Sequence, residues 1–403
     1  MEMIDSEIVI VGAGISGLAT SLGLHRLGVK SVVLEASDQL RTTGFALTIL
    51  GNAWRALDAL GVSEPLRQRH VQLLEFVATS LTSGQITAEK PLNAPGKHGE
   101  QEIRCLNRTV LLEALAKELP PGTIRYSSKL VHFEDSGNYK LVHLADGTIV
   151  KAKILVGCDG VNSVVAKWLG LGKAAYTGRS ALRGFVSFEN EHGYGQKFLQ
   201  YFGEGVRAGI LPCDEKSAYW FVTYSPSTET AGMEQDPTRM KQYVTDKLRK
   251  IDENMKPAIH NTSSETVFSS PLRYRRPWEF LTRSISKGNV CVAGDAFHPM
   301  TPDIGQGGCS ALEDAVVLAR CIAQALSETG MEEHKRIEMG LAKYARERKW
   351  RGFLLVSTAY VVGWVQVGNW KVTRFFRDKF LSPYLADLLL KISEFDCGKL
   401  TVL

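Results

Sequence analysis

Three glycines near the amino end have a spacing that is typical of a dinucleotide site. Gly12, Gly14 and Gly17 form a G-x-G-x-x-G turn directly after the apolar run EIVIV of residues 7–11. In such a turn the first glycine permits a tight bend, the second lets the backbone approach a pyrophosphate, and the third allows close helix packing. Glu35 follows Gly17 by 18 residues, where an acidic side chain can accept hydrogen bonds from a ribose. The pattern therefore predicts a bound dinucleotide with its phosphates at a helix amino terminus.

Two further segments are rich in glycine and polar residues. Residues 157–170 read GCDGVNSVVAKWLG, and residues 294–308 read GDAFHPMTPDIGQGG. Neither contains a second G-x-G-x-x-G turn between a strand and a helix. We therefore expect one dinucleotide in a dedicated site, while any second nucleotide binds transiently.

In this order and spacing, the three segments resemble the signatures of the single-component flavoprotein aromatic hydroxylases. This is the group of para-hydroxybenzoate and salicylate hydroxylases, and within it the plant monooxygenase-1-type proteins are the most similar. The resemblance covers nearly the whole chain and implies an α/β fold. Its parts are a Rossmann-like FAD-binding domain of the GR2 or para-hydroxybenzoate hydroxylase (PHBH) type, an inserted β-sheet substrate domain and a helical C-terminus.

The same resemblance implies a set of FAD contacts. Pro302, Gly307 and Gly308 would lie closest to the reacting atoms, with Pro302 at the boundary between flavin and substrate. Glycines that open the helix expected at 310–326 would aim free N–H groups and a positive dipole end at the flavin ring. The implied cofactor-binding residues are Gly12, Gly14, Ile15, Ser16, Gly17, Glu35, Ala36, Arg41, Arg108, Asp159, Gly160, Asp295, Pro302, Gly305, Gln306, Gly307 and Gly308. No metal site is expected.

The activity implied is that of an FAD-dependent NAD(P)H monooxygenase. NADPH or NADH would reduce the flavin as a transient electron donor, and O2 would form a C4a-hydroperoxide that passes one oxygen atom to an aromatic, in particular phenolic, small molecule. An epoxidase or oxidative cyclase acting on a larger apolar plant metabolite is an alternative, since the same oxidant epoxidises alkenes. A non-catalytic escort protein of this fold is less favoured, because the complete flavin motif would then have no role.

Substrate contacts are sought in the aromatic-rich middle of the chain. Candidates on strands with a period of two are Tyr201, Arg207, Trp220 and Tyr224, although each also suits a packing role. Arg183, Arg273 and Arg275 could hold an acidic group or lie in solvent. His298 is interpreted as a structural histidine in a packed turn. Phe297, where the family commonly has alanine, could narrow the space over the flavin.

The elements that must position these residues follow from the hydrophobic pattern. A strand, turn, helix and strand over residues 7–35 form a βαβ unit, and helices are expected at 52–61, 108–119, 240–251 and 310–326. Strand-like segments at 181–189, 197–205 and 218–224 predict a second sheet. The predicted domains are an FAD-binding domain of residues 1–179 and 277–330, a substrate domain of residues 180–276 and a C-terminal helical segment of residues 331–403.

Composition excludes several other classes. The 403 residues carry 48 basic and 43 acidic side chains, and the net charge of +5 is spread without a basic cluster, so nucleic acid is not an expected partner. Seven scattered cysteines without a C-x-x-C pair suggest neither zinc nor disulfides and favour a reducing compartment. With no leader pattern at Met1, we expect a cytoplasmic protein, a monomer or homodimer that binds a small aromatic substrate and O2.

One segment bears on membranes. Residues 352–369 lack formal charge over 18 positions, the lower limit for a membrane span, but polar residues interrupt them. We therefore expect no stable transmembrane span, while peripheral contact with a membrane surface stays open.

Overall fold

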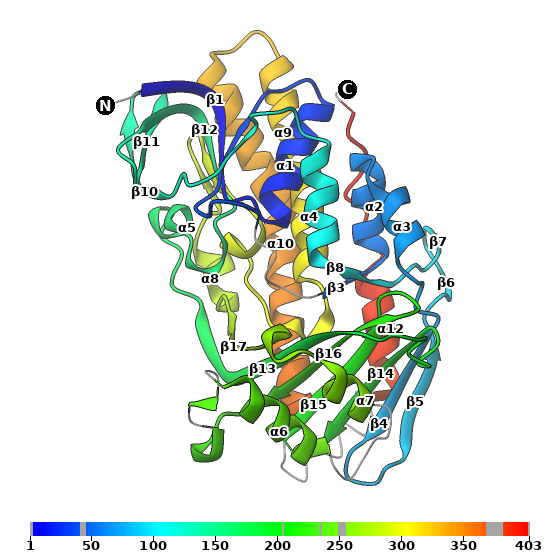
Figure 1. Ribbon diagram of the computed structural model, residues 1–403. Coiled ribbons are helices and arrows are strands. Elements are labelled where there is room, and N and C mark those ends of the chain that lie inside the picture. The colour runs from blue at the N-terminus through cyan, green and yellow to red at the C-terminus, as the bar shows by residue number, and fades with distance from the viewer. Residues whose placement is uncertain are drawn as a thin grey trace.

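The computed structural model describes residues 3–40, 46–203, 205–230, 232–233, 236–248, 255–367 and 382–401. Within them the strands form two large sheets, which occupy opposite ends of the molecule in Figure 1. The described residues also contain two small antiparallel sheets of two strands each. One pairs β3 (Ala46–Ile49) with β8 (Arg104–Asn107), and the other pairs β6 (Pro95–Gly96) with β7 (Gly99–Glu100).

The first large sheet carries the glycine turn. Its main order is β10-β11-β12-β1-β2-β9, and β19 joins it by pairing in parallel with the second half of β12. β1 lies parallel to both β12 and β2, as expected for a βαβ unit. The strands are β1 (Met3–Val11), β2 (Val32–Leu34), β9 (Ile124–Arg125), β10 (Leu130–Ser136), β11 (Tyr139–Leu144), β12 (Ile149–Gly157), β18 (Ser286–Lys287) and β19 (Val290–Val292).

Helices pack beside this sheet. α1 (Ile15–Arg26) contacts α9 (Gly307–Ser327), and α9 in turn contacts α10 (Glu333–Val367). The α1–α9 approach is close, because a Cβ added at Gly23 would lie 2.8 Å from the Cβ of Ala319. Other helices of this part are α2 (Gly51–Leu60), α3 (Ser63–Arg69), α4 (Arg108–Lys117), α5 (Val164–Trp168) and α8 (Pro277–Thr282).

The second large sheet has the order β17-β13-β16-β15-β14-β4-β5. Its strands are β4 (Glu75–Ser80), β5 (Ile86–Pro91), β13 (Ala175–Ser187), β14 (Lys197–Gly203), β15 (Val206–Pro212), β16 (Ser217–Tyr224) and β17 (Val267–Tyr274). α6 (Pro237–Leu248) and α7 (Met255–Asn261) pack on one face of this sheet, and α12 (Ser382–Ile392) packs against β5 (Figure 1).

Successive side chains along these strands point alternately into two separate hydrophobic clusters. On β16, Trp220 and Val222 point into a cluster shared with Val244 of α6 and Ile259 of α7. Their neighbour Phe221 belongs instead to the larger cluster of the first sheet and its helices. Successive side chains on a strand point to opposite faces, so this sheet separates a small core from the body of the protein.

The strand pairing bears on the domain division. The predicted substrate domain of residues 180–276 contains most of the second sheet, but β4 and β5 come from residues 75–91. β14 pairs in parallel with β4, with Tyr201 opposite Thr79. We propose that the substrate domain comprises residues 75–91 together with 175–276, and that the remainder forms the FAD-binding domain and the C-terminal helices.

The C-terminal segment is dominated by α10, which runs for 35 residues. Its uncharged stretch begins at Gly352, where an added Cβ would lie 2.8 Å from the ring of Phe297. Residues 368 and 369 of that stretch lie outside the described residues. In the part of the chain that the structure describes, we find no helix with the combined length and hydropathy of a membrane span. All seven cysteines are free and buried.

Candidate functional site

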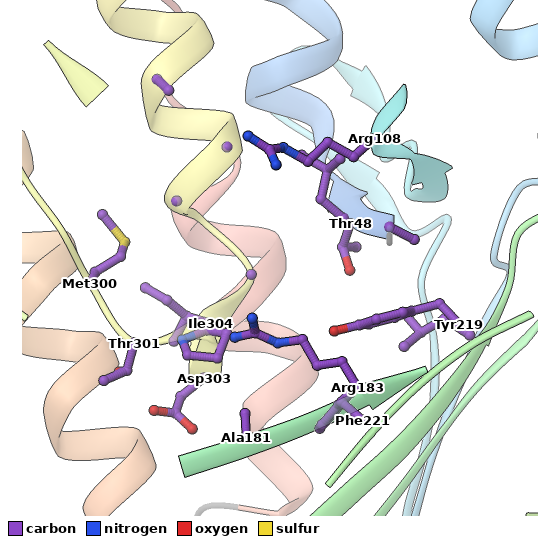
Figure 2. Close-up of a pocket in the computed structure, with 18 of the residues that line it drawn as sticks. Thr48, Arg108, Ala181, Arg183, Tyr219, Phe221, Met300, Thr301, Asp303 and Ile304 are labelled. Carbon is purple, nitrogen blue, oxygen red and sulfur yellow. The ribbon is translucent and has the colours of Figure 1, made fainter. Parts of the chain in front are cut away.

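A cavity of about 700 Å³ lies between the two large sheets. From the first sheet and its helices, Gly14 of the glycine turn, Arg108 of α4 and the start of α9 reach it. From the second sheet, β13, β15, β16 and β17 contribute side chains. Figure 2 shows one side of this cavity, where Arg183 reaches from the sheet toward Ile304 and the Tyr219 hydroxyl points in the same direction.

The three glycines of the first turn differ in what surrounds them. Gly12 has a φ of +101°, and a Cβ there would lie 2.5 Å from the carbonyl oxygen of Cys158. A Cβ at Gly17 would collide with the carbonyl oxygen of Gly12, whereas a Cβ at Gly14 would meet nothing within 4 Å. Gly12 and Gly17 are thus required by the fold, and the space at Gly14 is open for a ligand.

The helix that follows this turn presents free donors. Gly14 is the N-cap of α1, and the first intrahelical bond runs from the Leu18 N–H to the Gly14 carbonyl at 3.0 Å. The N–H groups of Ile15, Ser16 and Gly17 therefore have no partner within the helix. Gly14, Ile15 and Ser16 line the cavity, which suits a phosphate group at this point.

Glu35 supports the turn directly. Its Oε2 accepts a 2.8 Å hydrogen bond from the Ala13 N–H, and its Oε1 accepts one of 3.0 Å from the Ser37 N–H. The side chain is buried at the end of β2, so it holds the turn against the sheet. Contact of Glu35 with a ribose stays a prediction. Ala36 beside it is exposed, and Arg41 lies outside the described residues.

The opposite wall comes from the third glycine-rich segment. Asp295 is exposed toward the cavity, and Pro302, Gly305, Gly307 and Gly308 also line it. Gly305 has a φ of +63°. A Cβ at Gly308 would lie 2.5 Å from Leu47 Cδ1, so the backbone is close to its neighbour there. α9, with 21 residues, begins at this point and directs the positive end of its dipole into the cavity.

Gln306 does not line the cavity, although sequence reasoning placed it against the flavin ring. Its side chain is fully buried and accepts a 2.8 Å hydrogen bond from Asn52 Nδ2 of α2. Asn52 also donates to Glu313 of α9 at 2.5 Å. The Glu313 carboxylate pairs with Arg348 and Arg351 of α10 at 2.6 and 2.9 Å. This network anchors the loop before α9 from behind.

Asp159 has a local partner as well. Its Oδ2 accepts a 2.7 Å hydrogen bond from the Val164 N–H at the start of α5, and the residue does not line the cavity. Burial raises the pKa of its carboxyl group. Gly160 beside it, with a φ of +78°, does line the cavity. The second motif therefore presents backbone to the cavity and uses its carboxylate to cap a short helix.

Of the four predicted substrate residues, only Arg207 lines the cavity in the described structure. Tyr201, Trp220 and Tyr224 lie on the other face of the sheet, in the cluster formed with α6 and α7. Trp220 Nε1 donates to Thr262 Oγ1 at 2.8 Å there. The side chains of β16 that line the cavity are those at the alternate positions, because a shift of one residue along a strand moves a side chain to the opposite face.

The cavity face of this sheet contains residues that were not proposed as contacts. On β16 they are Tyr219, Phe221 and Thr223, each one position away from the predicted residues. Arg183 of β13, which the sequence had suggested as a possible holder of an acidic group, also lines the cavity and lies opposite Phe221 in the strand pairing. In the sequence, this face corresponds to the odd-numbered positions of β16, which carry polar and aromatic side chains.

Asp303 forms a buried ion cluster at the edge of the cavity. Its side chain is completely buried and accepts hydrogen bonds of 3.2 and 2.8 Å from the two terminal nitrogens of Arg179. Arg207 Nη1 lies 3.5 Å from the same carboxylate. A buried carboxylate needs such compensation, so this cluster ties the segment 302–304 to strands β13 and β15.

His298 and Phe297 are both buried outside the cavity lining. His298 Nε2 lies 2.7 Å from Asp314 Oδ2 and 3.1 Å from Ser310 Oγ, which places it in a structural network. Although burial alone would raise the pKa of Asp314, the charges of His298 and Arg348 hold it below its ordinary value. Phe297 packs edge-on against Phe280 of α8. It therefore does not narrow the space above the cavity.

Comparison with known proteins agrees with this geometry. Residues 5–359 match a family model described as FAD binding domain. Over 403 residues the chain is 52% identical to Monooxygenase 2 of Arabidopsis thaliana, covering 98% of each chain. It is 37% identical to Monooxygenase 1 of the same plant, covering 98% of this chain and 99% of the relative.

Solved structures share the fold. HpxO of Klebsiella pneumoniae, complexed with FAD and uric acid, superposes with a TM-score of 0.82 at 20% identity, covering 99% of this chain and 98% of that chain. The tetrameric form of 2-methyl-3-hydroxypyridine-5-carboxylic acid oxygenase gives a TM-score of 0.74 at 18% identity over 98% of each chain.

Proposed function

The chain belongs to the FAD binding domain family and is an FAD-dependent monooxygenase, and from this premise we propose that it inserts one oxygen atom from O2 into an aromatic small molecule. NADPH or NADH would supply the electrons by transient binding, since the sequence contains a single G-x-G-x-x-G turn between a strand and a helix. The observation that carries the proposal is the continuous cavity, which joins the open space at Gly14 to the aromatic face of the second sheet.

The residues of the cavity fit FAD. The free N–H groups at the start of α1 suit the pyrophosphate, and the open position of Gly14 leaves room for it. Asp295 lines the cavity and would offer a carboxylate acceptor for the ribitol hydroxyls. The start of α9 at Gly307 and Gly308 offers N–H donors to the flavin ring where negative charge develops on reduction.

Bound FAD would supply the oxidising chemistry by accepting a hydride and activating O2. The chain itself would exclude water and hold the substrate ring. Phe198, Leu211 and Phe221 provide an apolar floor for that ring. Pro302 lines the same cavity, and it would lie at the boundary where flavin and substrate meet. Such enclosure protects a reactive oxygen species from hydrolysis.

The test is turnover of the FAD-loaded protein under isotopically labelled O2 in ordinary water. Phenolic compounds are first screened for those that accelerate NAD(P)H oxidation, and the product mass is then measured. One labelled oxygen atom in the product is expected. Unlabelled product, or turnover that persists without oxygen, would contradict the proposal. The Arg273→Gln protein is a matched control, since Arg273 belongs to β17 of the same sheet but does not line the cavity.

A further inference from the structure

The long helix α10 exposes a row of large apolar side chains. Trp350, Leu354, Val361 and Trp364 are 64%, 45%, 56% and 60% exposed, respectively. Together with the partly exposed Ser357, they follow one another at intervals of four, three, four and three residues. This alternation has an average period of about 3.5 residues, so the five side chains lie along one line of the helix. We call these five residues the α10 stripe.

The opposite side of α10 is buried in the protein. Gly352 lies against the ring of Phe297, and Leu355, Val356 and Ala359 are completely buried. α10 contacts α8, α9 and the strands β14 and β15. These contacts already hold the helix in place, so packing within the chain does not account for the α10 stripe. A row of large apolar side chains in water marks an interaction surface.

The order of the side chains indicates the kind of partner. From either end, the α10 stripe presents a tryptophan, then an aliphatic residue, and then Ser357 at its centre. Such a surface is complementary to itself under a two-fold rotation, as the interface of a symmetric dimer requires. An antiparallel second copy centred on Ser357 would place Trp350 against Trp364 and Leu354 against Val361. The small serine would lie where the two helices come closest.

The distribution of charge favours this antiparallel arrangement. Arg346 is exposed and extends the line of the α10 stripe by one turn, whereas residues 352–367 contain no charged side chain. A parallel pair would bring the two copies of Arg346 together, and like charges in contact are unfavourable. An antiparallel pair separates them. A membrane surface fits less well, because a helix that lies on lipid has a strongly charged polar face, and the opposite face of α10 is buried and apolar.

The area of the α10 stripe is sufficient for a dimer of modest affinity. A buried aromatic side chain contributes about 150–250 Å², and each copy offers two tryptophans together with Leu354 and Val361. Two copies would therefore remove roughly 1,000 Å² of surface from water, which is the level that a specific interface should reach. The neighbouring helix α8 adds two more exposed apolar side chains, Trp278 and Leu281.

We propose that the α10 stripe is the contact between two copies of this chain, which form an antiparallel homodimer with two-fold symmetry. The four tryptophans lie at the two ends of the contact and the two serines at its centre. This assignment goes beyond the proposed function and does not depend on it, because the contact involves neither the substrate nor the electron donor.

The experiment measures the mass of the full-length, FAD-loaded protein by sedimentation velocity over a dilution series. The protein should be a dimer at about 50 µM and should dissociate on dilution. Val361→Glu should weaken the dimer at least tenfold, because it would place a carboxylate against an apolar surface. Ile86→Glu is the matched control, since Ile86 is an equally exposed aliphatic residue of β5. It should leave the dimer unchanged, and thermal unfolding by circular dichroism verifies that both variants are folded.

Complementary charges test the antiparallel arrangement. Leu354→Lys alone should also weaken the dimer, and it keeps the test available if Val361→Glu does not fold. The double variant Leu354→Lys/Val361→Glu should dimerise more tightly than either single variant, because each lysine would meet a glutamate of the second copy. In a parallel pair, like charges would meet, and the double variant would dimerise more weakly than both.

The proposal is overturned if the protein is a monomer throughout the dilution series, or if Val361→Glu dimerises as tightly as Ile86→Glu. A double variant that is weaker than both single variants would overturn the antiparallel pairing. Binding of the monomer to phosphatidylglycerol vesicles is measured in parallel by co-sedimentation. Binding that is lost in Val361→Glu, without any dimer in solution, would assign the α10 stripe to a lipid surface instead of a second copy.

Discussion

Replacing Gly14 by valine should weaken FAD binding by orders of magnitude while leaving the fold intact. The residue has φ −81° and ψ −175°, an extended conformation that valine adopts readily. A Cβ at this position meets no protein atom within 4 Å. We expect the free energy of unfolding of the FAD-free protein to change by less than about 1 kcal/mol, since loss of chain flexibility in the unfolded state favours the variant slightly.

The loss of affinity follows from the donors at the start of α1. The valine side chain would occupy the space through which a phosphate reaches the N–H groups of Ile15 and Ser16. Loss of two charge-assisted hydrogen bonds at about 1.5–3 kcal/mol each removes about 3–6 kcal/mol of binding free energy. That range corresponds to a weakening of about 10²-fold to 10⁴-fold.

The assay is titration of the FAD-free protein with FAD, followed by quenching of flavin fluorescence, together with thermal unfolding by circular dichroism. Gly17→Ala is the matched control, because its added methyl group collides with the Gly12 carbonyl. That variant should lose about 1–3 kcal/mol of stability from overpacking. FAD affinity of Gly14→Val within threefold of the unmodified protein would refute the reasoning, and so would a loss of stability as large as that of Gly17→Ala.

Three further results are expected. Asp295→Ala should weaken FAD binding about tenfold or more, because a charge-assisted hydrogen bond contributes about 1.5–3 kcal/mol; unchanged affinity in a folded variant would contradict the ribitol contact. Asn52→Leu should lower the free energy of unfolding by about 1–3 kcal/mol, measured by urea titration, because the buried amide of Gln306 loses its partner. The pKa values of Glu313 and Asp314 are lowered, since the charges of buried arginines and His298 outweigh the effect of burial. A lowered folded-state pKa contributes stability above the ordinary carboxyl pKa of about 4 and loses it on acidification, so the thermal midpoint should fall steeply below about pH 4; a flat profile down to pH 3 would contradict this.

Local sequence predicted the elements that depend on neighbouring residues. The βαβ unit was evident because its strand, turn and helix are contiguous, and α9 begins at Gly307, within three residues of the expected start. The place of β4 in the second sheet was missed, since its partner β14 is more than 100 residues away and no local pattern specifies that pairing. β5 joins the sheet only through its hairpin with β4. The bond from Asn52 to Gln306 spans 254 positions and was equally invisible.

The middle of the chain shows a different limit. Periodicity indicates that alternate side chains share a face, but it does not say which face meets the cavity. On β16 both sets are rich in aromatic residues, so Trp220 was as plausible as Tyr219. The choice depends on α6 and α7, which cover one face with their own apolar side chains. Which face is covered is therefore decided by helices that lie further along the chain than the strand itself.

The two-faced second sheet has a consequence for how such a protein can change its specificity. Side chains at 219, 221 and 223 meet only the cavity side, whereas those at 220, 222 and 224 maintain a separate core. Mutations in the first set alter what the cavity accepts, although Tyr219 and Phe221 also pack with the larger cluster, and mutations in the second set disturb the small core. Libraries for new substrates are therefore best confined to odd-numbered positions of this strand, and drift among related genes should leave the even-numbered positions apolar or aromatic while the odd-numbered ones diverge.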